Sequence, residues 1–365
     1  MTRPRARDLG LHFDGTPGPN NAITDVTGIT VGFSTVIEPA QEGAHKGLCT
    51  GVTAIIPRGV SGSMLPVWAG LHSFNGNGEL TGGHHIADLG WFSGPVMLTN
   101  SHSVGMVSHA TVGWMIDRHG DAFQRDHLWC LPVVGETYDG VLNDINARGI
   151  REEHALEALQ GAKPGPVAEG NVGGGTGMIA YEFKGGTGTA SRRVEVAGES
   201  YDLGVLVQAN HGTRDWLEIS GVPVGRHMRD DLVFPRDLGS IIVVIATDAP
   251  LLPHQLNRLA RRGAIGIGRN GTKGGHGSGD IFLAFSTANG VDNPWHAPDI
   301  MELQALKDTH LDVFYAAAVQ ATEEAVVNAM IAAEDRIAIK PVGMKVRAID
   351  HGALADLLRT SFRPG

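Results

Sequence analysis

Short apolar runs constrain the fold of this chain more than any other feature of its sequence. They lie at residues 29–33, 53–57, 95–99, 131–135, 178–183, 203–208, 240–247 and 281–285. Several show little alternation between apolar and polar residues, so we expect strands that are buried on both faces. Helical periodicity recurs between them, at residues 104–118, 151–159, 253–262 and most clearly 311–333. Because strands and helices are interleaved in groups, the sequence predicts an α/β protein of stacked layers.

Glycine is abundant and clusters between these apolar runs. It accounts for 51 of the 365 residues, about twice the average share, and follows no repeat period. Tight turns between strands are the expected result. Linker-like stretches occur at residues 163–175, 185–191 and 230–239, but none has the character of a domain boundary. We therefore expect a single domain that spans residues 1–365.

Charge and cysteine content argue against several classes of protein. The formal net charge of −10 opposes binding to a phosphate backbone. Two cysteines, Cys49 and Cys130, cannot form a disulfide framework or a four-cysteine zinc site. The first 25 residues lack the apolar run of a signal peptide, and no later stretch reaches the roughly 20 apolar residues that span a bilayer. We expect a soluble, cytoplasmic protein that binds neither nucleic acid nor membranes.

The most β-prone run of the chain begins at Ser240, directly after a loop that ends at Gly239. Gly-Ser is also a common turn pair before a strand, so this junction does not establish chemistry by itself. Glycine nevertheless permits strained backbone conformations and leaves its carbonyl open to attack by the Ser240 hydroxyl. An N-to-O acyl shift followed by hydrolysis would then cut the chain. The new N-terminal serine would carry both a nucleophile and an α-amine, with a pKa of about 8, that can act as general base.

Polar side chains lie near the ends of three other predicted strands. Ser278 and Asp280 stand two residues apart at a strand entrance, so both should point to the same side. Glu136 and Tyr138 project together past a strand end, where α/β architectures often place ligands. Asn210 follows another strand, and its amide could donate a hydrogen bond to a developing oxyanion. On its own, each of these residues fits a turn or a cap better than a catalytic role.

Three further motifs do not support a cofactor or metal site. Residues 266–271 match GxGxxG, but they follow a predicted helix and so lack the context of a dinucleotide fold. His84 and His85 are adjacent, would diverge on a strand, and have no zinc-ligand spacing around them. The glycine-rich run at 171–177 has no lysine to complete a P-loop, which favours a flexible loop near a pocket. We expect neither a metal nor an organic cofactor.

Taken together and in order, six segments resemble the DmpA-type β-peptidyl aminopeptidases. The resemblance covers nearly the whole chain and rests on residues 20–28, 134–140, 171–178, 207–212, 239–250 and 276–287. Members of that family are autoproteolytic and resemble N-terminal-nucleophile hydrolases, with a different chain connectivity. The resemblance implies a four-layer αββα sandwich and cleavage into an α chain, 1–239, and a β chain, 240–365. It also implies a tetramer of αβ units and no cofactor.

The resemblance assigns the centre of the site to three residues. Ser240 matches the nucleophile, and the bond between Gly239 and Ser240 matches the bond that is cut. Ser278 and Asp280 match the pair that orients the amine and hydroxyl of that serine. Characterised relatives carry the longer glutamate where Asp280 stands, which keeps the charge and shortens the reach.

The same resemblance assigns the substrate side of the site. Tyr138 and Asn210 match groups near the acyl carbonyl and its oxyanion, and Glu136 matches the carboxylate that holds the free amine of the substrate. The implied activity is removal of an N-terminal residue from short peptides, amides or esters. That residue is a β-amino acid such as β-alanine or, in some members, D-alanine or a small L-residue.

Two alternative functions are weighed against this one. An acyltransferase that resembles ornithine acetyltransferase would share the self-cleaving logic, but that family uses a threonine nucleophile and this chain has Ser240. A chain that no longer cleaves could act as a binding or scaffold protein. Intact polypeptide without hydrolase activity would favour that reading, whereas retention of all the candidate catalytic residues opposes it.

Overall fold

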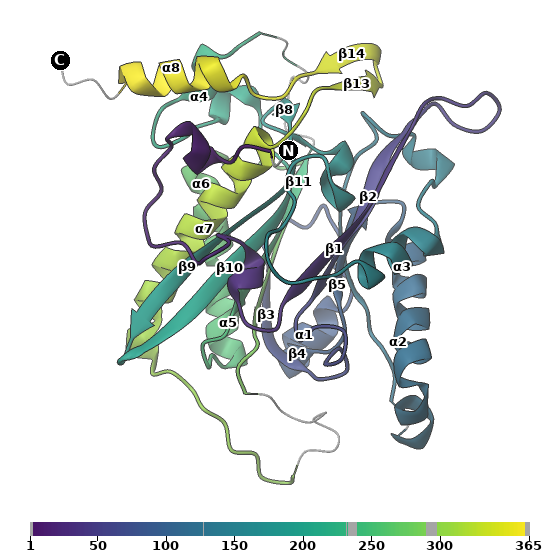
Figure 1. Cartoon of the computed structure of the whole chain (residues 1–365), viewed down its shortest axis with the longest axis vertical. Helices are drawn as coiled ribbons and strands as arrows, with labels where there is room; N and C mark the ends of the chain where they lie inside the picture. Colours follow the sequence, from purple (N-terminus) through teal and green to yellow (C-terminus); the bar gives the residue numbers. More distant parts are fainter. Residues whose placement is uncertain (1–2, 127, 231, 233–238, 290–297, 362–365) are drawn as a thin grey trace.

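A computed structural model describes residues 3–126, 128–230, 232, 239–289 and 298–361. Two β-sheets form its centre (Figure 1). One has four strands in the order β1-β2-β5-β6, and the other has six in the order β4-β3-β12-β11-β10-β9. The strands of the smaller sheet are β1 (Thr30–Glu38), β2 (Leu48–Ile56), β5 (Val96–Asn100) and β6 (Val133–Thr137). Those of the larger sheet are β3 (Val67–Ser73), β4 (Trp91–Phe92), β9 (Gly186–Val196), β10 (Glu199–Asn210), β11 (Ser240–Thr247) and β12 (Gly279–Ser286).

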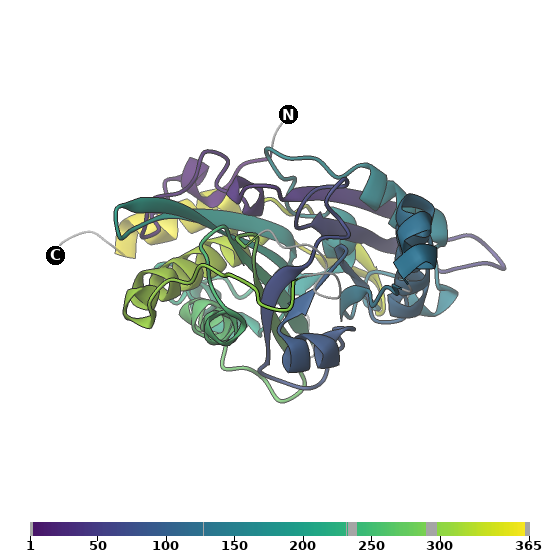
Figure 2. The same cartoon turned by 90° about the horizontal axis from the view of Figure 1, so that it is seen from below.

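Helices cover the outer faces of the two sheets (Figures 1 and 2). The smaller sheet packs against α2 (Val104–Asp126) and α3 (Glu152–Gln160), and the larger against α5 (Pro253–Ala260), α6 (Arg262–Arg269) and α7 (Leu311–Ile331). A third apolar cluster fills the space between the sheets. This arrangement confirms the predicted αββα sandwich. Peripheral elements are α1 (Gly83–Leu89), α4 (Val224–His227), α8 (His351–Ser361), β7 (Ile179–Ala180), β8 (Phe183–Lys184), β13 (Arg336–Ile339) and β14 (Val342–Val346).

Strand β11 occupies the middle of the larger sheet. It pairs antiparallel with β10 and parallel with β12, and every residue in it is buried. Ile241 and Val243 belong to the apolar cluster under the helices, whereas Ile242 and Val244 belong to the cluster between the sheets. Burial on both faces explains why its sequence is a continuous apolar run rather than an alternating one.

Several predicted elements differ from those observed. Residues 185–191 look like a linker but form the first part of β9, because α7 passes so close that only small residues fit there. A Cβ added to Gly188 would lie 2.0 Å from the carbonyl oxygen of Ala325. Residues 178–183 are not one strand, because Tyr181 and Glu182 adopt φ values of 50° and 62° and turn the chain between β7 and β8. Strand β3, with its glycine and histidine, was not predicted.

The motifs set aside in the sequence have structural explanations. The GxGxxG match begins in α6, where a Cβ on Gly266 would lie 2.5 Å from Cβ of Thr322 in α7. Gly266 therefore permits close packing of the two helices, whereas Gly271 lies against the Trp216 carbonyl oxygen. His84 and His85 lie on helix α1, not on a strand. In the part of the chain that the structure describes, no group of three or more metal-ligating side chains is arranged to hold a metal ion.

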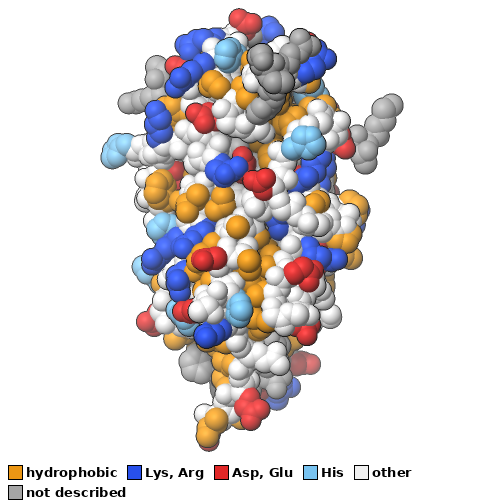
Figure 3. Space-filling view, turned by 90° about the vertical axis from the view of Figure 1, so that its left-hand side faces the viewer, with side chains coloured by type: hydrophobic (Ala, Val, Ile, Leu, Met, Phe, Trp, Pro, Cys, Tyr) orange, Lys and Arg blue, Asp and Glu red, His pale blue; other side chains and the backbone are white. Residues whose placement is uncertain are grey.

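The surface shows no separation of side chains by type on the side that carries α7 and α8. Figure 3 shows basic, acidic and hydrophobic side chains interspersed over that face. Among the described residues, none of the helices combines the length and the apolar character that crossing a membrane requires.

Candidate active site

Ser240 is the first residue of β11 and has neighbours on both sides in the sheet. Its register partners are Asn210 on β10 and Gly279 on β12. The Ser240 hydroxyl donates to the Gly239 carbonyl oxygen at 2.8 Å and accepts a hydrogen bond from the Gly279 N–H at 3.2 Å. The side chain is thereby held against the peptide bond that precedes it.

Gly239 is required at its position by close packing. A Cβ at this residue would lie 1.7 Å from the Asn210 carbonyl oxygen and 2.9 Å from the His211 Cα. No side chain fits at such distances, so any other residue would push the loop end away from β10. The reason for glycine is therefore the space available, in addition to the carbonyl access that the sequence suggests.

Ser278 and Asp280 flank the glycine whose amide contacts the serine. The Ser278 hydroxyl donates to Asp280 Oδ1 at 2.5 Å, and both side chains are buried. The amide of Asn75 donates to the other carboxylate oxygen, Oδ2, at 3.1 Å. Asp280 thus reaches Ser278 directly although its side chain is shorter than the glutamate of relatives. Hydrogen bonds on both of its carboxylate oxygens fix its orientation.

Glu136 lies near the end of β6, and its carboxylate is held by two donors. Oε1 accepts the Glu79 N–H at 3.0 Å, and Oε2 accepts a hydrogen bond from the Ser101 hydroxyl. The residue is 7% exposed. A carboxylate fixed in this way keeps lone pairs available for one further cation.

Asn210 and Tyr138 are linked through the backbone. Asn210 Nδ2 donates to the Tyr138 carbonyl oxygen at 3.0 Å, and its Oδ1 accepts the Ile179 N–H at 2.7 Å. One amide hydrogen of Asn210 is thus used to position Tyr138, and the second is the one that could serve an oxyanion. The Tyr138 side chain itself is 39% exposed.

A cavity of about 460 Å³ joins several of these residues. It is lined by Asn77, Gly78, Glu79, Ser101, Val104, Glu136, Tyr138 and Ser240. The predicted nucleophile, amine-binding carboxylate and tyrosine therefore meet in one space. The Ser278–Asp280 pair adjoins it through Gly279, whose N–H contacts Ser240.

Residues 74–79 connect the two ends of this site and were not predicted to belong to it. Asn75 contacts Asp280, the Asn77 amide donates to the Gly277 carbonyl oxygen at 2.7 Å, and Glu79 supports Glu136 through its backbone. The run of asparagine, glycine and glutamate in this segment is as polar as the segments that were singled out. That polarity marks the segment as a candidate loop near the site, but it does not identify the distant partners of its residues.

Burial perturbs two ionisable groups next to the site. It lowers the pKa of His211 to about 3, which makes this ring a weak base at neutral pH. It raises the pKa of Asp139 to about 7, although Asn143 donates a hydrogen bond to Oδ1 at 3.0 Å. Neither group lines the cavity.

Comparison with known proteins settles the family. The sequence profile of Peptidase family S58 matches residues 21–340. The chain belongs to peptidase family S58. One similar protein is the beta-peptidyl aminopeptidase BapA of Sphingosinicella microcystinivorans, which is 48% identical over 98% of this chain and 92% of that protein. The BapA of Sphingosinicella xenopeptidilytica is 45% identical over 99% and 92%.

Comparison with a solved structure supports this assignment over the whole length of the chain. The L-aminopeptidase D-Ala-esterase/amidase from Ochrobactrum anthropi, a prototype for the serine aminopeptidases and a variant of the Ntn hydrolase fold, superimposes with a TM-score of 0.95. It is 56% identical, and each chain covers 100% of the other. The chain is therefore a serine-type aminopeptidase with an Ntn-hydrolase-like fold, as the resemblance predicted. The acyltransferase alternative is not favoured.

Proposed function

We propose that this single-domain chain cuts itself between Gly239 and Ser240, and that the freed Ser240 is the nucleophile of the mature aminopeptidase. The observation that carries the proposal is the Ser240 hydroxyl, which lies 2.8 Å from the carbonyl oxygen of a glycine that no other residue can replace. The Ser240 oxygen attacks the Gly239 carbonyl carbon, the C–N bond breaks, and the nitrogen takes the proton. Water then hydrolyses the ester to a Gly239 carboxylate and a free serine.

In the mature enzyme, the α-amine of Ser240 accepts the hydroxyl proton as the hydroxyl attacks the substrate carbonyl. Ser278 and Asp280 orient that amine and hydroxyl. The second amide hydrogen of Asn210 stabilises the oxyanion, and Tyr138 contacts the acyl group. The low pKa of His211 supports the amine rather than this histidine as base, because a group with a pKa of about 3 accepts protons poorly at neutral pH.

Glu136 binds the free amine of the substrate. Its carboxylate shares the cavity with Ser240, and a charge-assisted pair there restricts cleavage to the N-terminal residue. The names of the BapA relatives support β-amino acids as the N-terminal residues released from peptides. The family resemblance supports β-alanine among them, and short amides and esters as further substrates. The Ochrobactrum enzyme supports D-alanine derivatives and L-residues as further substrates. The family resemblance supports a tetramer of αβ units, which size-exclusion chromatography tests.

Intact-mass spectrometry tests self-cleavage, and β-alanine p-nitroanilide tests the activity. Wild-type protein is expected to give two fragments that meet at the 239–240 bond and to hydrolyse the anilide. Ser240→Ala is expected to stay uncut and inactive, because alanine offers no attacking oxygen. Ser286→Ala is the matched control: it removes another buried hydroxyl, at the far end of β12, and should still cleave. An active preparation that consists of uncut chain would overturn the proposal.

A further inference from the structure

Two carboxylates line the candidate substrate cavity, and the proposed function uses one of them. Glu136 is buried and holds the substrate amine, whereas Glu79 is exposed and has no role in that chemistry. The remaining lining is mostly polar, and Val104 is the one aliphatic residue among the described residues that line it. Glu79 is therefore the charged group of this lining that the proposed chemistry leaves unused.

The position of Glu79 is fixed relative to Glu136. The Glu79 N–H donates to Glu136 Oε1 at 3.0 Å, and the Glu136 N–H donates to the Glu79 carbonyl oxygen at 3.3 Å. A β-bridge between Leu80 and Gly135 continues this pairing. Because the backbone is held on both sides, Glu79 stays beside Glu136, and its side chain reaches the cavity that both residues line.

The charge of Glu79 is not balanced by the protein. No arginine or lysine is among the described residues that line the cavity, and none lies within ion-pair distance of Glu79 in the described part of the chain. A substrate with one ammonium group satisfies Glu136 and leaves the second carboxylate unmatched. A substrate with a second positive charge satisfies both.

We propose that Glu79 determines specificity and favours substrates whose N-terminal residue has a positively charged side chain. The substrate class is thus an amine-terminated peptide or amide that begins with a basic residue, such as β-homolysine. This inference rests on the proposed function, because Glu136 must hold the main-chain amine for the side chain to meet Glu79. The attraction acts across a wet cavity, so a single pair contributes up to about 1 kcal/mol, or roughly fivefold in kcat/KM.

Kinetics with a matched pair of substrates test the proposal. The p-nitroanilides of β-homolysine and β-homonorleucine have side chains of similar length and differ in charge. Wild-type enzyme is expected to prefer β-homolysine, and Glu79→Gln is expected to lower the ratio of the two kcat/KM values about fivefold. Glu42→Gln removes the same charge from the exposed tip of the β1–β2 hairpin, away from the cavity, and should leave the ratio unchanged.

A binding measurement separates this inference from the proposed function. Titration calorimetry of the Ser240→Ala protein with β-homolysinamide and β-homonorleucinamide reports recognition without turnover. Tighter binding of β-homolysinamide that Glu79→Gln removes supports the role of Glu79 even if β-alanine p-nitroanilide is not hydrolysed. Equal affinities, or a preference that survives in Glu79→Gln, overturn the inference even if self-cleavage and hydrolysis occur as proposed.

Discussion

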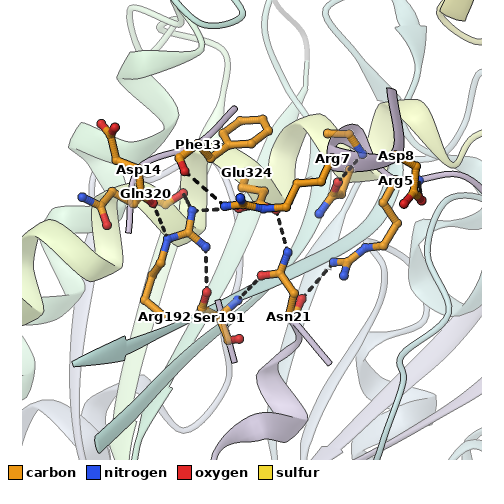
Figure 4. Close-up of polar contacts among 12 residues, drawn as sticks. Arg5, Arg7, Asp8, Phe13, Asp14, Asn21, Ser191, Arg192, Gln320 and Glu324 are labelled. Carbon is orange, nitrogen blue, oxygen red and sulfur yellow. Dashed lines mark hydrogen bonds and ion pairs between the residues drawn. The ribbon is translucent and has the colours of Figure 1, made fainter. Parts of the chain in front are cut away.

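Two clusters of charge in this protein differ in how completely they are paired. The N-terminal ion network, defined as Arg5, Arg7, Arg192, Glu169 and Glu324, joins the start of the chain to β9 and α7. Figure 4 shows Arg5, Arg7, Arg192 and Glu324 of this network. The candidate substrate cavity contains Glu79 and Glu136 and has no basic residue in its described lining. Both clusters contain carboxylates, but only the N-terminal ion network contains arginines that pair with them.

The pairing in the network is dense. Arg192 is 1% exposed and donates to Glu324 Oε2 at 2.7 Å, while Arg7 and Asn21 donate to Oε1 at 2.7 and 2.6 Å. Arg5 holds Glu169 at 2.6 Å. Because these charged groups are paired with one another inside the protein, they stabilise one arrangement of the chain and are not available to bind a ligand. The contrast teaches that unmatched carboxylates in a cavity indicate binding, whereas matched ones indicate structure.

The largest effect on stability is expected in the network. Arg192→Leu removes a buried partner of Glu324 and should lower the free energy of unfolding by about 3–5 kcal/mol. Arg193→Leu, one residue along β9, removes an arginine side chain that is 44% exposed and pairs with Asp202 at 3.2 Å, and should lower stability much less, because solvent screens that pair. Urea unfolding in the Ser240→Ala background, where the chain is continuous, measures both. Equal losses would remove the distinction between the network and an ordinary surface pair.

The next effect is on catalysis. Glu136→Gln retains acceptor capacity for the Glu79 N–H and removes the charge that we propose holds the substrate amine. We expect kcat/KM for β-alanine p-nitroanilide to fall about 10- to 100-fold, as for loss of one charged hydrogen bond, with little change in urea unfolding. Steady-state kinetics beside the unfolding curve check it. A loss of stability that matches the loss of activity would make Glu136 a structural residue like Glu324.

A smaller effect concerns the pH dependence of kcat/KM, which should rise as the Ser240 α-amine loses its proton. A carboxylate near an ammonium favours the charged form, so Asp280 raises the pKa of the amine. Asp280→Asn should therefore move the rising limb to lower pH, by about one pH unit. Profiles of the two enzymes that superimpose would show that Asp280 does not act on the base.

The smallest expected effect is a difference in how the two clusters respond to salt concentration. Raising the ionic strength from about 0.05 to 0.5 M shortens the Debye length and screens exposed charges more than buried ones. The preference for β-homolysine over β-homonorleucine should fall about two- to threefold, because Glu79 is exposed. The stability difference between wild-type Arg192 and its leucine variant should change little. A preference that does not respond to salt would argue against an electrostatic role for Glu79.

The sequence predicted those parts of the molecule that depend on local pattern. Residues 240–247 were expected as a strand and form β11 with the same bounds, and the spacing of Ser278 and Asp280 correctly indicated that they share a side. Strand β9 was missed because glycines that permit contact with α7 look like those of a flexible linker. Asn75 was missed because its partner Asp280 lies 205 residues away, and no local pattern encodes such a contact.

The prediction for Asn210 was incomplete for a related reason. Its position after a strand suggested a free amide, and nothing nearby in the sequence indicates that this amide holds the Tyr138 backbone, 72 residues away. The amine-binding side of the site was likewise predicted from Glu136 alone. Its neighbour Glu79 comes from another segment of the chain, and only the fold brings the two together.

The position of β11 in the sheet determines how mobile an N-terminus at Ser240 would be. A new N-terminus is usually among the most mobile parts of a protein, yet cleavage before Ser240 would create one in the interior of a sheet, between β10 and β12. The terminal amine would then begin with very little positional entropy left to lose when a substrate binds. Cutting the chain at the head of a central strand gives the catalyst a free amine that is already confined, as effective intramolecular reactions require.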